Sequence, residues 1–180
     1  HEVNLTNEAV YDISSAFVKW VADHTKKEVK DLVFAVGHDS RISADRIRDA
    51  VISVVSDMGV SILNCSYCST PAMFMTTVTR NCDGAIQITA SHHPFDRNGL
   101  KFFTRDGGLS GDELKNILAE AENEPCEKTE KTGAVTPIDY ISEYAELLRN
   151  MIKQGVNAEN YEKPLDGFKI SVDAGNGVGG

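Results

Sequence analysis

The chain has 180 residues, of which 41% are hydrophobic and 25% are charged, and its formal net charge is −9. This composition excludes a disordered chain, and the length fits one domain with a real core plus part of a second. The negative charge disfavours sequence-independent binding of nucleic acid, because such binding depends on Lys and Arg side chains that neutralise phosphates. An anionic ligand must therefore meet a local basic patch.

The cysteines bear on the cellular compartment. Four cysteines without an apolar leader favour a reducing compartment, so we expect a cytoplasmic protein with free thiols. No run of about 18 apolar residues is present, and no membrane span is expected. Cys65 and Cys68 have the spacing of a zinc knuckle or a redox pair, but no second pair follows, and we interpret them as ordinary thiols.

The N-terminal third alternates helix and strand. Thr6 can cap a helix whose apolar residues recur at spacings of three and four, which predicts that it runs to about His24. A nearly continuous apolar run at residues 32–36 predicts a strand that is covered on both faces. Ser43 can cap the next helix, whose apolar stripe repeats in the same way before Gly59.

The middle of the chain continues this α/β pattern. Residues 60–63 predict a second strand, and the Thr-Pro pair at 70–71 predicts the cap and first turn of a short helix. Residues 85–89 alternate small or apolar with polar side chains, and residues 100–103 are apolar and aromatic. Both segments therefore predict strands, which flank a polar turn.

The C-terminal part begins with a helix and a linker. Residues 109–114 combine a capping box with a hydrophobic staple at the start of a helix, and residues 123–136 have the composition of a solvated linker. We expect another helix from Thr136-Pro137 to about Ile152. A strand is expected at 168–172, and the glycine-rich turn that ends it can present backbone N–H groups to an anion.

The polar turn holds the candidate catalytic residues. It places the hydroxyl of Ser91 beside the imidazoles of His92 and His93, while Pro94 fixes the backbone and the turn at Asn98 reverses it. A rigid loop of this kind would hold the serine in one place.

Simpler roles are open for each of these residues. Most turn serines bond only to their own backbone, and Lys101 can be a solvent-facing strand residue. A hydrolase triad with His92 or His93 as the base is disfavoured, because the chain has no Gly-x-Ser-x-Gly elbow and adjacent residues rarely make a productive pair. The order and spacing of the whole loop favour catalysis.

Two loops carry a family resemblance. Thr-Ala-Ser-His-His-Pro at 89–94, followed by Asn-Gly-Leu-Lys-Phe-Phe, resembles the active-site loop of the α-D-phosphohexomutases, the phosphoglucomutase and phosphomannomutase superfamily, although the usual form has Asn at His93. Residues 37–41 resemble the family's Gly-Arg-Asp-x-Arg loop, with His38 in place of the first Arg. Taken alone, that second loop predicts only an Asx turn at Asp39.

The resemblance implies a fold and a division of the chain. We expect a three-layer α/β/α domain with a mixed, mainly parallel sheet over residues 1–133, followed by an incomplete second α/β domain over residues 134–180. The family's first strand is expected before Thr6, and its Asp-rich metal loop beyond Gly180. We therefore interpret the chain as a fragment of a longer protein, and we expect the fragment alone to be inactive.

The resemblance also implies a function. This is intramolecular phosphotransfer between hexose 1-phosphate and hexose 6-phosphate through a phosphoserine and a hexose 1,6-bisphosphate, which also serves as activator. The residues to which it assigns roles are Ser91, His92 and Lys101 in catalysis and His38, Arg41, Arg97 and Asn98 in substrate and phosphate binding. It implies Mg²⁺ bound through the phosphate of Ser91, and as partners a hexose phosphate and further domains of the same chain. The departures at His38 and His93 leave open a non-catalytic, phosphorylated module that senses sugar phosphates.

Overall fold

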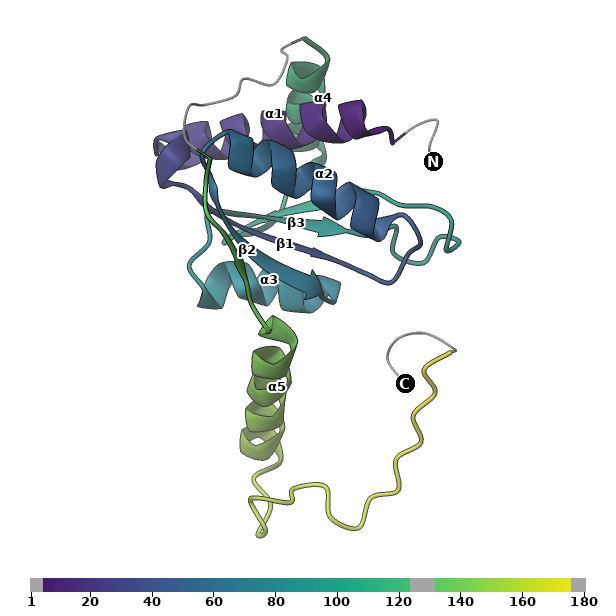
Figure 1. Ribbon diagram of the computed structural model, residues 1–180. Helices are drawn as coiled ribbons and strands as arrows, with labels where there is room; N and C mark the ends of the chain where they lie inside the picture. The colour runs from purple at the N-terminus through teal and green to yellow at the C-terminus, as the bar shows by residue number, and fades with distance from the viewer. Residues whose placement is uncertain (1–4, 124–131, 176–180) are drawn as a thin grey trace.

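The structure of the chain, a computed structural model, describes residues 5–123 and 132–175. Its main body has three layers, a six-stranded sheet with helices on both faces, as expected from the sequence (Figure 1). In their order across the sheet the strands are β5 (Gly107–Gly108), β4 (Leu100–Thr104), β3 (Gly84–Ile88), β1 (Val33–His38), β2 (Ser61–Tyr67) and β6 (Val135–Pro137). The helices are α1 (Asn7–Thr25), η1 (Val29–Asp31, a 3-10 turn), α2 (Ala44–Asp57), α3 (Thr70–Thr79), α4 (Gly111–Asn123) and α5 (Tyr140–Val156).

The sheet is mixed but mainly parallel. β1 pairs in parallel with β2 and β3, and β6 pairs in parallel with β2, whereas β4 runs antiparallel to β3. The carboxyl ends of β1, β2 and β3 therefore lie at one edge of the sheet, where open α/β folds place their ligand loops. Both loops that carry the family resemblance begin at this edge.

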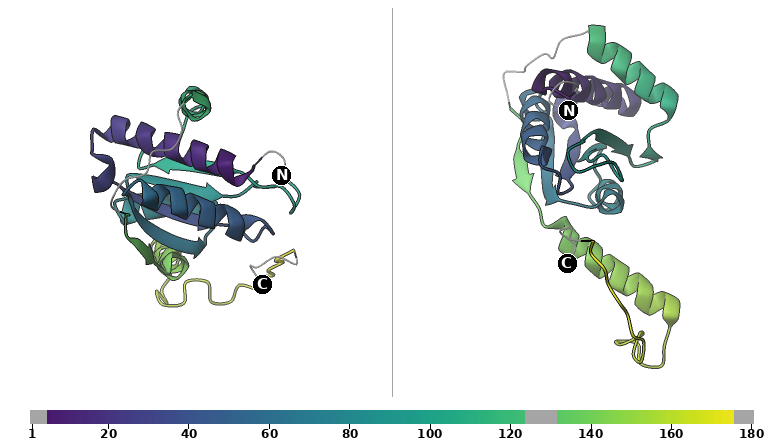
Figure 2. Two further views of the ribbon diagram at one scale, coloured as in Figure 1. Left: turned by 45° about the horizontal axis from the view of Figure 1, so that its top comes forward. Right: turned by 90° about the vertical axis from the view of Figure 1, so that its right-hand side faces the viewer.

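Helices α1 and α2 cover one face of the sheet, and α4 packs on the outer side of α1 (Figure 2). An aromatic cluster forms the centre of this layer. The ring of Phe17 in α1 lies 5.4 Å from that of Phe34 in β1 and 4.4 Å from that of Phe102 in β4, measured between centroids. The apolar stripes seen in the sequence supply this core.

Helix α3 covers the opposite face over a smaller core. The buried members of this core are Ala35, Cys65, Cys68, Ala72, Met73, Cys82, Ala85 and Tyr140. Cys65, Cys68 and Cys82 are free thiols, while Cys126 lies outside the described residues. Gly37 makes room for Met73 of α3 and for the segment before this helix, since a Cβ at this position would overlap Met73 Cε and lie 2.9 Å from Cys68 Cβ.

Two helix starts have the capping bonds predicted from the sequence. The Thr6 hydroxyl accepts a hydrogen bond at the start of α1, and Ser110 and Glu113 form the predicted capping box of α4. The prediction of Thr70 as the cap of α3 is wrong, because the hydroxyl of Ser69 caps this helix and Thr70 is its first residue.

The helix predicted from Thr136-Pro137 begins later than expected. These residues belong to β6, where Ile62 N donates to Ala134 O at 2.7 Å and Ile138 N donates to Asn64 O at 2.9 Å. Proline is tolerated here because an edge strand pairs on one side only. Asp139 instead caps α5 through its carboxylate.

The strand predicted at residues 168–172 is wrong. The chain there is irregular and exposed, with Phe168 at 71% and Val172 at 81% of full exposure. A strand needs a neighbour for its backbone hydrogen bonds, and no described strand lies beside this segment. An apolar run alone is therefore not sufficient.

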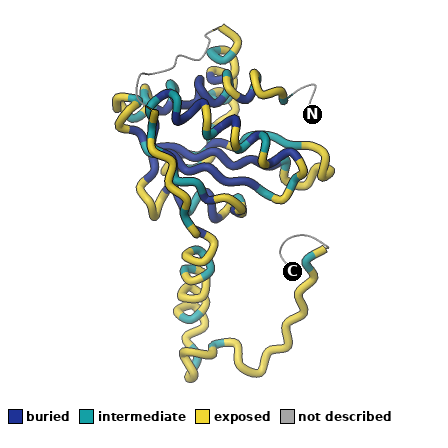
Figure 3. The backbone as a smooth tube through the Cα atoms, in the orientation of Figure 1, coloured by how far each residue is buried: buried dark blue, intermediate teal, exposed yellow. Residues whose placement is uncertain are grey.

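Helix α5 extends away from the sheet and is largely exposed (Figure 3). Tyr140 is its one buried residue, and the Tyr140 hydroxyl lies 2.7 Å from Thr79 Oγ1 of α3. Segments 124–131 of the predicted linker and 176–180 of the glycine-rich turn lie outside the described residues. The division of the chain at residue 133 stays a prediction. None of the described helices has the length and apolar character that a bilayer span requires.

Candidate active site

Ser91 is presented at the sheet edge by the loop that follows β3. Its φ of +56° lies in the left-handed region, which a non-glycine residue rarely adopts. Its N–H donates to Thr89 Oγ1 at 2.9 Å, and its carbonyl accepts from Arg41 Nη2 at 2.6 Å. Both peptide groups of Ser91 are thus held, while the exposed hydroxyl makes no hydrogen bond to a described residue.

The guanidinium of Arg41 binds the backbone of this loop. A guanidinium has five N–H donors, and here each faces an acceptor. The acceptors are Asp39 Oδ2 at 3.0 Å and the carbonyl oxygens of Ser91 at 2.6 Å, His93 at 2.9 Å, Arg97 at 2.9 Å and Pro94. The Arg41 side chain is only 8% exposed. Its predicted contact with a substrate phosphate would have to replace one of these bonds.

Asp39 connects Arg41 to the end of β3. Its Oδ1 accepts from Arg41 N at 3.2 Å, which confirms the Asx turn predicted from the sequence. Its Oδ2 also accepts from Thr89 Oγ1 at 2.6 Å, and this hydroxyl is the one that accepts from Ser91 N. The roles of Asp39 and Thr89 in holding the serine were missed in the sequence, because the two residues are 50 positions apart.

His38 lies beneath the loops rather than in them. Its side chain is 1% exposed and packs against Tyr67, with the ring planes tilted by 53° and the centroids 4.7 Å apart. Its Nδ1 is 2.8 Å from Asp39 O and its Nε2 is 3.2 Å from Arg48 Nη1. Because a carbonyl only accepts and a guanidinium only donates, the geometry places the proton on Nδ1. Phosphate binding by His38, predicted from the family resemblance, would require it to leave these contacts.

Asn98 holds the far end of the loop. Its Nδ2 donates to Ser43 Oγ at 3.1 Å, which ties the loop to the start of α2. Ser43 is the N-cap residue of α2, as predicted, but its hydroxyl makes no capping bond. The exposed side chain of Arg97, in contrast, makes no hydrogen bond or ion pair to a described residue. Arg97 can therefore receive an anion without losing a contact.

Lys101 lies at the base of the same hairpin. Thr89 N donates to Gly99 O at 3.0 Å, and Lys101 is paired with Gln87 across β3 and β4. The Lys101 side chain is exposed and makes no bond to a described residue. The exposed ring of His92 stacks on His93 with the centroids 5.2 Å apart. The hairpin thus combines one hydroxyl with cationic and imidazole groups that make no hydrogen bond or ion pair to the described residues.

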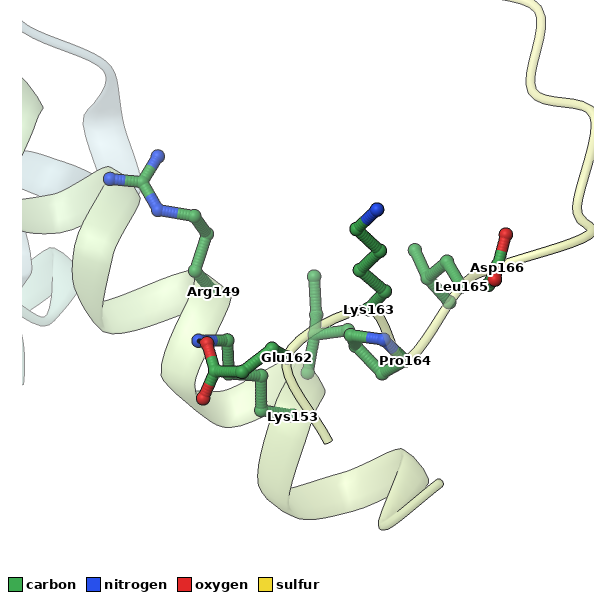
Figure 4. Close-up of a pocket in the computed structure, with 8 residues that line it drawn as sticks. Arg149, Lys153, Glu162, Lys163, Pro164, Leu165 and Asp166 are labelled. Carbon is green, nitrogen blue, oxygen red and sulfur yellow. Dashed lines mark hydrogen bonds and ion pairs between the residues drawn. The ribbon is translucent and has the colours of Figure 1, made fainter. Parts of the chain in front are cut away.

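Two other features of the structure concern ligands. No group of three or more His, Cys, Asp and Glu side chains in the described ranges 5–123 and 132–175 could hold a metal ion. A pocket between α5 and residues 162–166 contains the ion pair of Lys153 and Glu162, whose Nζ and Oε2 are 2.6 Å apart (Figure 4). The segments that line this pocket lie along the lower part of α5 and the chain after it, on the other side of the sheet layer from α1 and away from the loop that follows β3 (Figure 1).

Comparison with known proteins gives consistent matches. Residues 1–127 match the family model described as phosphoglucomutase/phosphomannomutase, alpha/beta/alpha domain I. A phosphoglucomutase of Neisseria gonorrhoeae is 29% identical over 98% of this chain and 35% of its own length, and a phosphoglucosamine mutase of Lactobacillus helveticus is 30% identical over 88% and 35%. The crystal structure of a phosphoglucomutase/phosphomannomutase family protein of Burkholderia thailandensis superposes with a TM-score of 0.68 at 21% identity, over 84% of this chain and 32% of that one. The chain therefore spans about a third of the length of these proteins.

Proposed function

Since the chain belongs to the phosphoglucomutase/phosphomannomutase family, we propose that it supplies the phosphoserine loop of a hexose-phosphate mutase. The observation that supports this most directly is the state of Ser91. Its backbone is held on both sides, by Thr89 and Arg41, while its hydroxyl is exposed. A group that lends and recovers a phosphoryl group needs this combination of fixed position and access.

The proposed reaction moves phosphate between the 1- and 6-hydroxyls of one hexose. In the first transfer the bond between phosphorus and Ser91 Oγ breaks as a bond forms to the free sugar hydroxyl. The proton of the sugar hydroxyl passes to a base, and Ser91 Oγ takes up a proton to become a hydroxyl again. The product is a hexose 1,6-bisphosphate, which returns its other phosphate to Ser91. The same bisphosphate, added from outside, would phosphorylate an unmodified serine and so act as activator.

The exposed residues of the hairpin have the chemistry for the remaining roles. Lys101 would accept the proton or offset charge on the transferring group, and His92 would orient the loop or assist proton movement. The guanidinium of Arg97, which makes no bond within the described part of the chain, can bind a substrate phosphate. Phosphate binding by Arg41, His38 and Asn98 stays a prediction.

Mg²⁺ fits this chain only through the modified serine. A phosphoserine carries about −1.5 to −2 charges at neutral pH, and its oxygens are the hard ligands that Mg²⁺ prefers. The described residues offer no cluster of carboxylates beside it, so further ligands would come from other domains of the full-length protein. Bound Mg²⁺ would offset the charge of the phosphoserine.

The cytoplasmic location also stays a prediction.

The test is phosphate uptake by the full-length protein that contains this chain. After incubation with glucose 1,6-bisphosphate, peptide mass spectrometry should locate one phosphate on Ser91, and Ser91→Ala should abolish uptake. Ser40→Ala is a matched control, since Ser40 is also exposed and lies next to Arg41. Phosphate on another serine, or none at all, would contradict the proposal. Uptake on Ser91 without turnover of glucose 1-phosphate would favour a sensing module instead.

A further inference from the structure

The carbonyl oxygens of the serine loop converge on one buried guanidinium. We propose that Arg41 is a positioning residue that holds the serine loop in its active shape and does not itself bind the transferred phosphate. The positioning role of Arg41 is inferred from the geometry alone, whereas the effect of Arg41 on phosphoryl transfer rests on the function proposed above.

The first support is the number and origin of the bonds. Four of the five donors of Arg41 bind carbonyl groups of the exposed segment 91–97. Within this segment and its start, the backbone bonds are few, namely His93 N to Ala90 O at 3.1 Å and Arg97 N to Pro94 O at 3.0 Å. Hydrogen bonds from a charged donor are stronger than bonds between neutral groups. Arg41 is therefore the main cross-link of the loop.

The second support is the electrostatic surrounding of the guanidinium. Its donor edge is covered by carbonyl oxygens, which carry partial negative charge, and its charge is already offset by Asp39 at 3.0 Å. A phosphate would have to displace these oxygens and enter a site where the Arg41 side chain is 8% exposed. Arg97 has neither obstacle, since its side chain is exposed and bonds to none of the residues that the structure describes.

The third support is the conformation of Ser91. A residue with a Cβ holds a left-handed φ only where its surroundings determine it. Here Arg41 donates to the carbonyl of Ser91, and the N–H of Ser91 donates to the hydroxyl of Thr89. Arg41 and Thr89 both donate to Oδ2 of Asp39, which links the two contacts. Loss of Arg41 would release the carbonyl of Ser91 and leave the Asp39 carboxylate without its cation.

The experiment uses hydrogen exchange of the loop amides in the full-length protein, first in the wild type without phosphate. A structural cross-link predicts that the amides of His93 and Arg97 exchange slowly even when no anion is present. A phosphate ligand predicts slow exchange only after phosphate is added or Ser91 is phosphorylated. This comparison needs no variant and no activity, and the second result would overturn the proposal.

Variants then separate positioning from binding. Arg41→Lys retains the positive charge but replaces the forked guanidinium by a single nitrogen. Hydrogen exchange of the loop amides should therefore accelerate by about tenfold or more. The rate of Ser91 phosphorylation should fall, with little change in the KM for glucose 1,6-bisphosphate. In Arg41→Ala, millimolar guanidinium should restore slow exchange. Arg97→Lys is the matched control and should leave loop exchange unchanged. A higher KM with unchanged loop exchange in Arg41→Lys would identify a phosphate ligand. Loosened loops in a protein that never takes up phosphate would contradict the proposed function but not the cross-link.

Discussion

At the scale of single residues, the exposure of a side chain decides how its loss divides between stability and chemistry. Lys101 is exposed and bonds to no described residue, so Lys101→Ala should change the free energy of unfolding by less than about 0.5 kcal/mol. The same change should slow phosphoryl transfer from Ser91 in the full-length protein by about 100-fold or more, because it removes a cation near the transferring group. Single-turnover transfer from the phosphorylated protein measures this.

The control for Lys101 is Lys115→Ala. Lys115 is also exposed, but it lies on α4 and its ammonium pairs with Asp112 at 3.1 Å, away from the serine loop. Transfer should be unaffected in this variant. If Lys101→Ala transfers at the same rate as Lys115→Ala, Lys101 is an ordinary surface residue.

The buried thiol of Cys82 makes the free energy of unfolding depend on pH in the alkaline range. Burial raises the pKa of Cys82 from its ordinary value of 9.0 to about 12. The folded state therefore holds this proton more tightly than the unfolded state, so the contribution to stability is complete below about pH 9 and is lost as pH rises towards 12. In this window the free energy of unfolding should fall with pH more steeply in the wild type than in Cys82→Ala.

The expected difference in slope has an upper limit of about 1.4 kcal/mol per pH unit, the value for one proton. Urea unfolding of both proteins at several values between about pH 8.5 and 10.5 measures it, with the variant correcting for other titrating groups. Parallel pH dependences in the two proteins would show that Cys82 ionises equally in the folded and unfolded states.

At the scale of elements, the edge strand β6 depends on one glycine. Gly133 N donates to Ser56 O at 2.8 Å, and a Cβ at Gly133 would overlap the carbonyl oxygen of Val60 and lie 2.9 Å from Gly59 C. Gly133→Ala should therefore displace β6 and destabilise the protein by about 2 kcal/mol or more. Urea unfolding gives the stability, and hydrogen exchange of Ile62 N, which bonds to Ala134 O, reports on the strand itself.

A matched glycine is available in α5. A Cβ at Gly155 would meet nothing within 4 Å, so Gly155→Ala should be neutral or stabilise by up to about 1 kcal/mol. Equal effects of the two substitutions would mean that backbone entropy, and not the close approach to Val60, determines the cost at Gly133.

The elements that could be predicted from the sequence are those with local causes. Helix α1 depends on a cap at Thr6 and on spacings of three and four, both of which lie within the segment itself. The segment of β6 was predicted to start a helix, and residues 168–172 were predicted to form a strand. Both predictions are wrong, because a strand depends on a neighbouring strand, which the sequence of a single segment does not reveal. The site divides in the same way. Ser91 and Lys101 are predicted from one short motif, whereas the bonds from Arg41 to the serine loop join residues 50 to 56 positions apart and could not be predicted from the sequence.

At the scale of the whole molecule, the serine loop and the described segment from α5 to residue 175 are largely exposed to solvent. The loop is exposed from Ser91 to Arg97. Helix α5 contacts the end of α3, where Tyr140 meets Thr79 and Glu143 forms an ion pair with Arg80. The main body between them has a continuous core on each face of the sheet. Folding of this chain and assembly of an active site are therefore separable properties.

The corresponding prediction concerns the 180-residue chain expressed alone. It should unfold cooperatively, because the described residues form a six-stranded sheet with a buried core on each face. It should not interconvert glucose 1-phosphate and glucose 6-phosphate, since transfer without loss to water needs an enclosed site and Ser91 lies in an exposed loop. A coupled assay with glucose 1,6-bisphosphate and Mg²⁺ measures turnover, and circular dichroism shows that the chain is folded. Turnover that disappears in Ser91→Ala would contradict this prediction, and it would mean that the active site is completed by this chain itself or by a second copy of it.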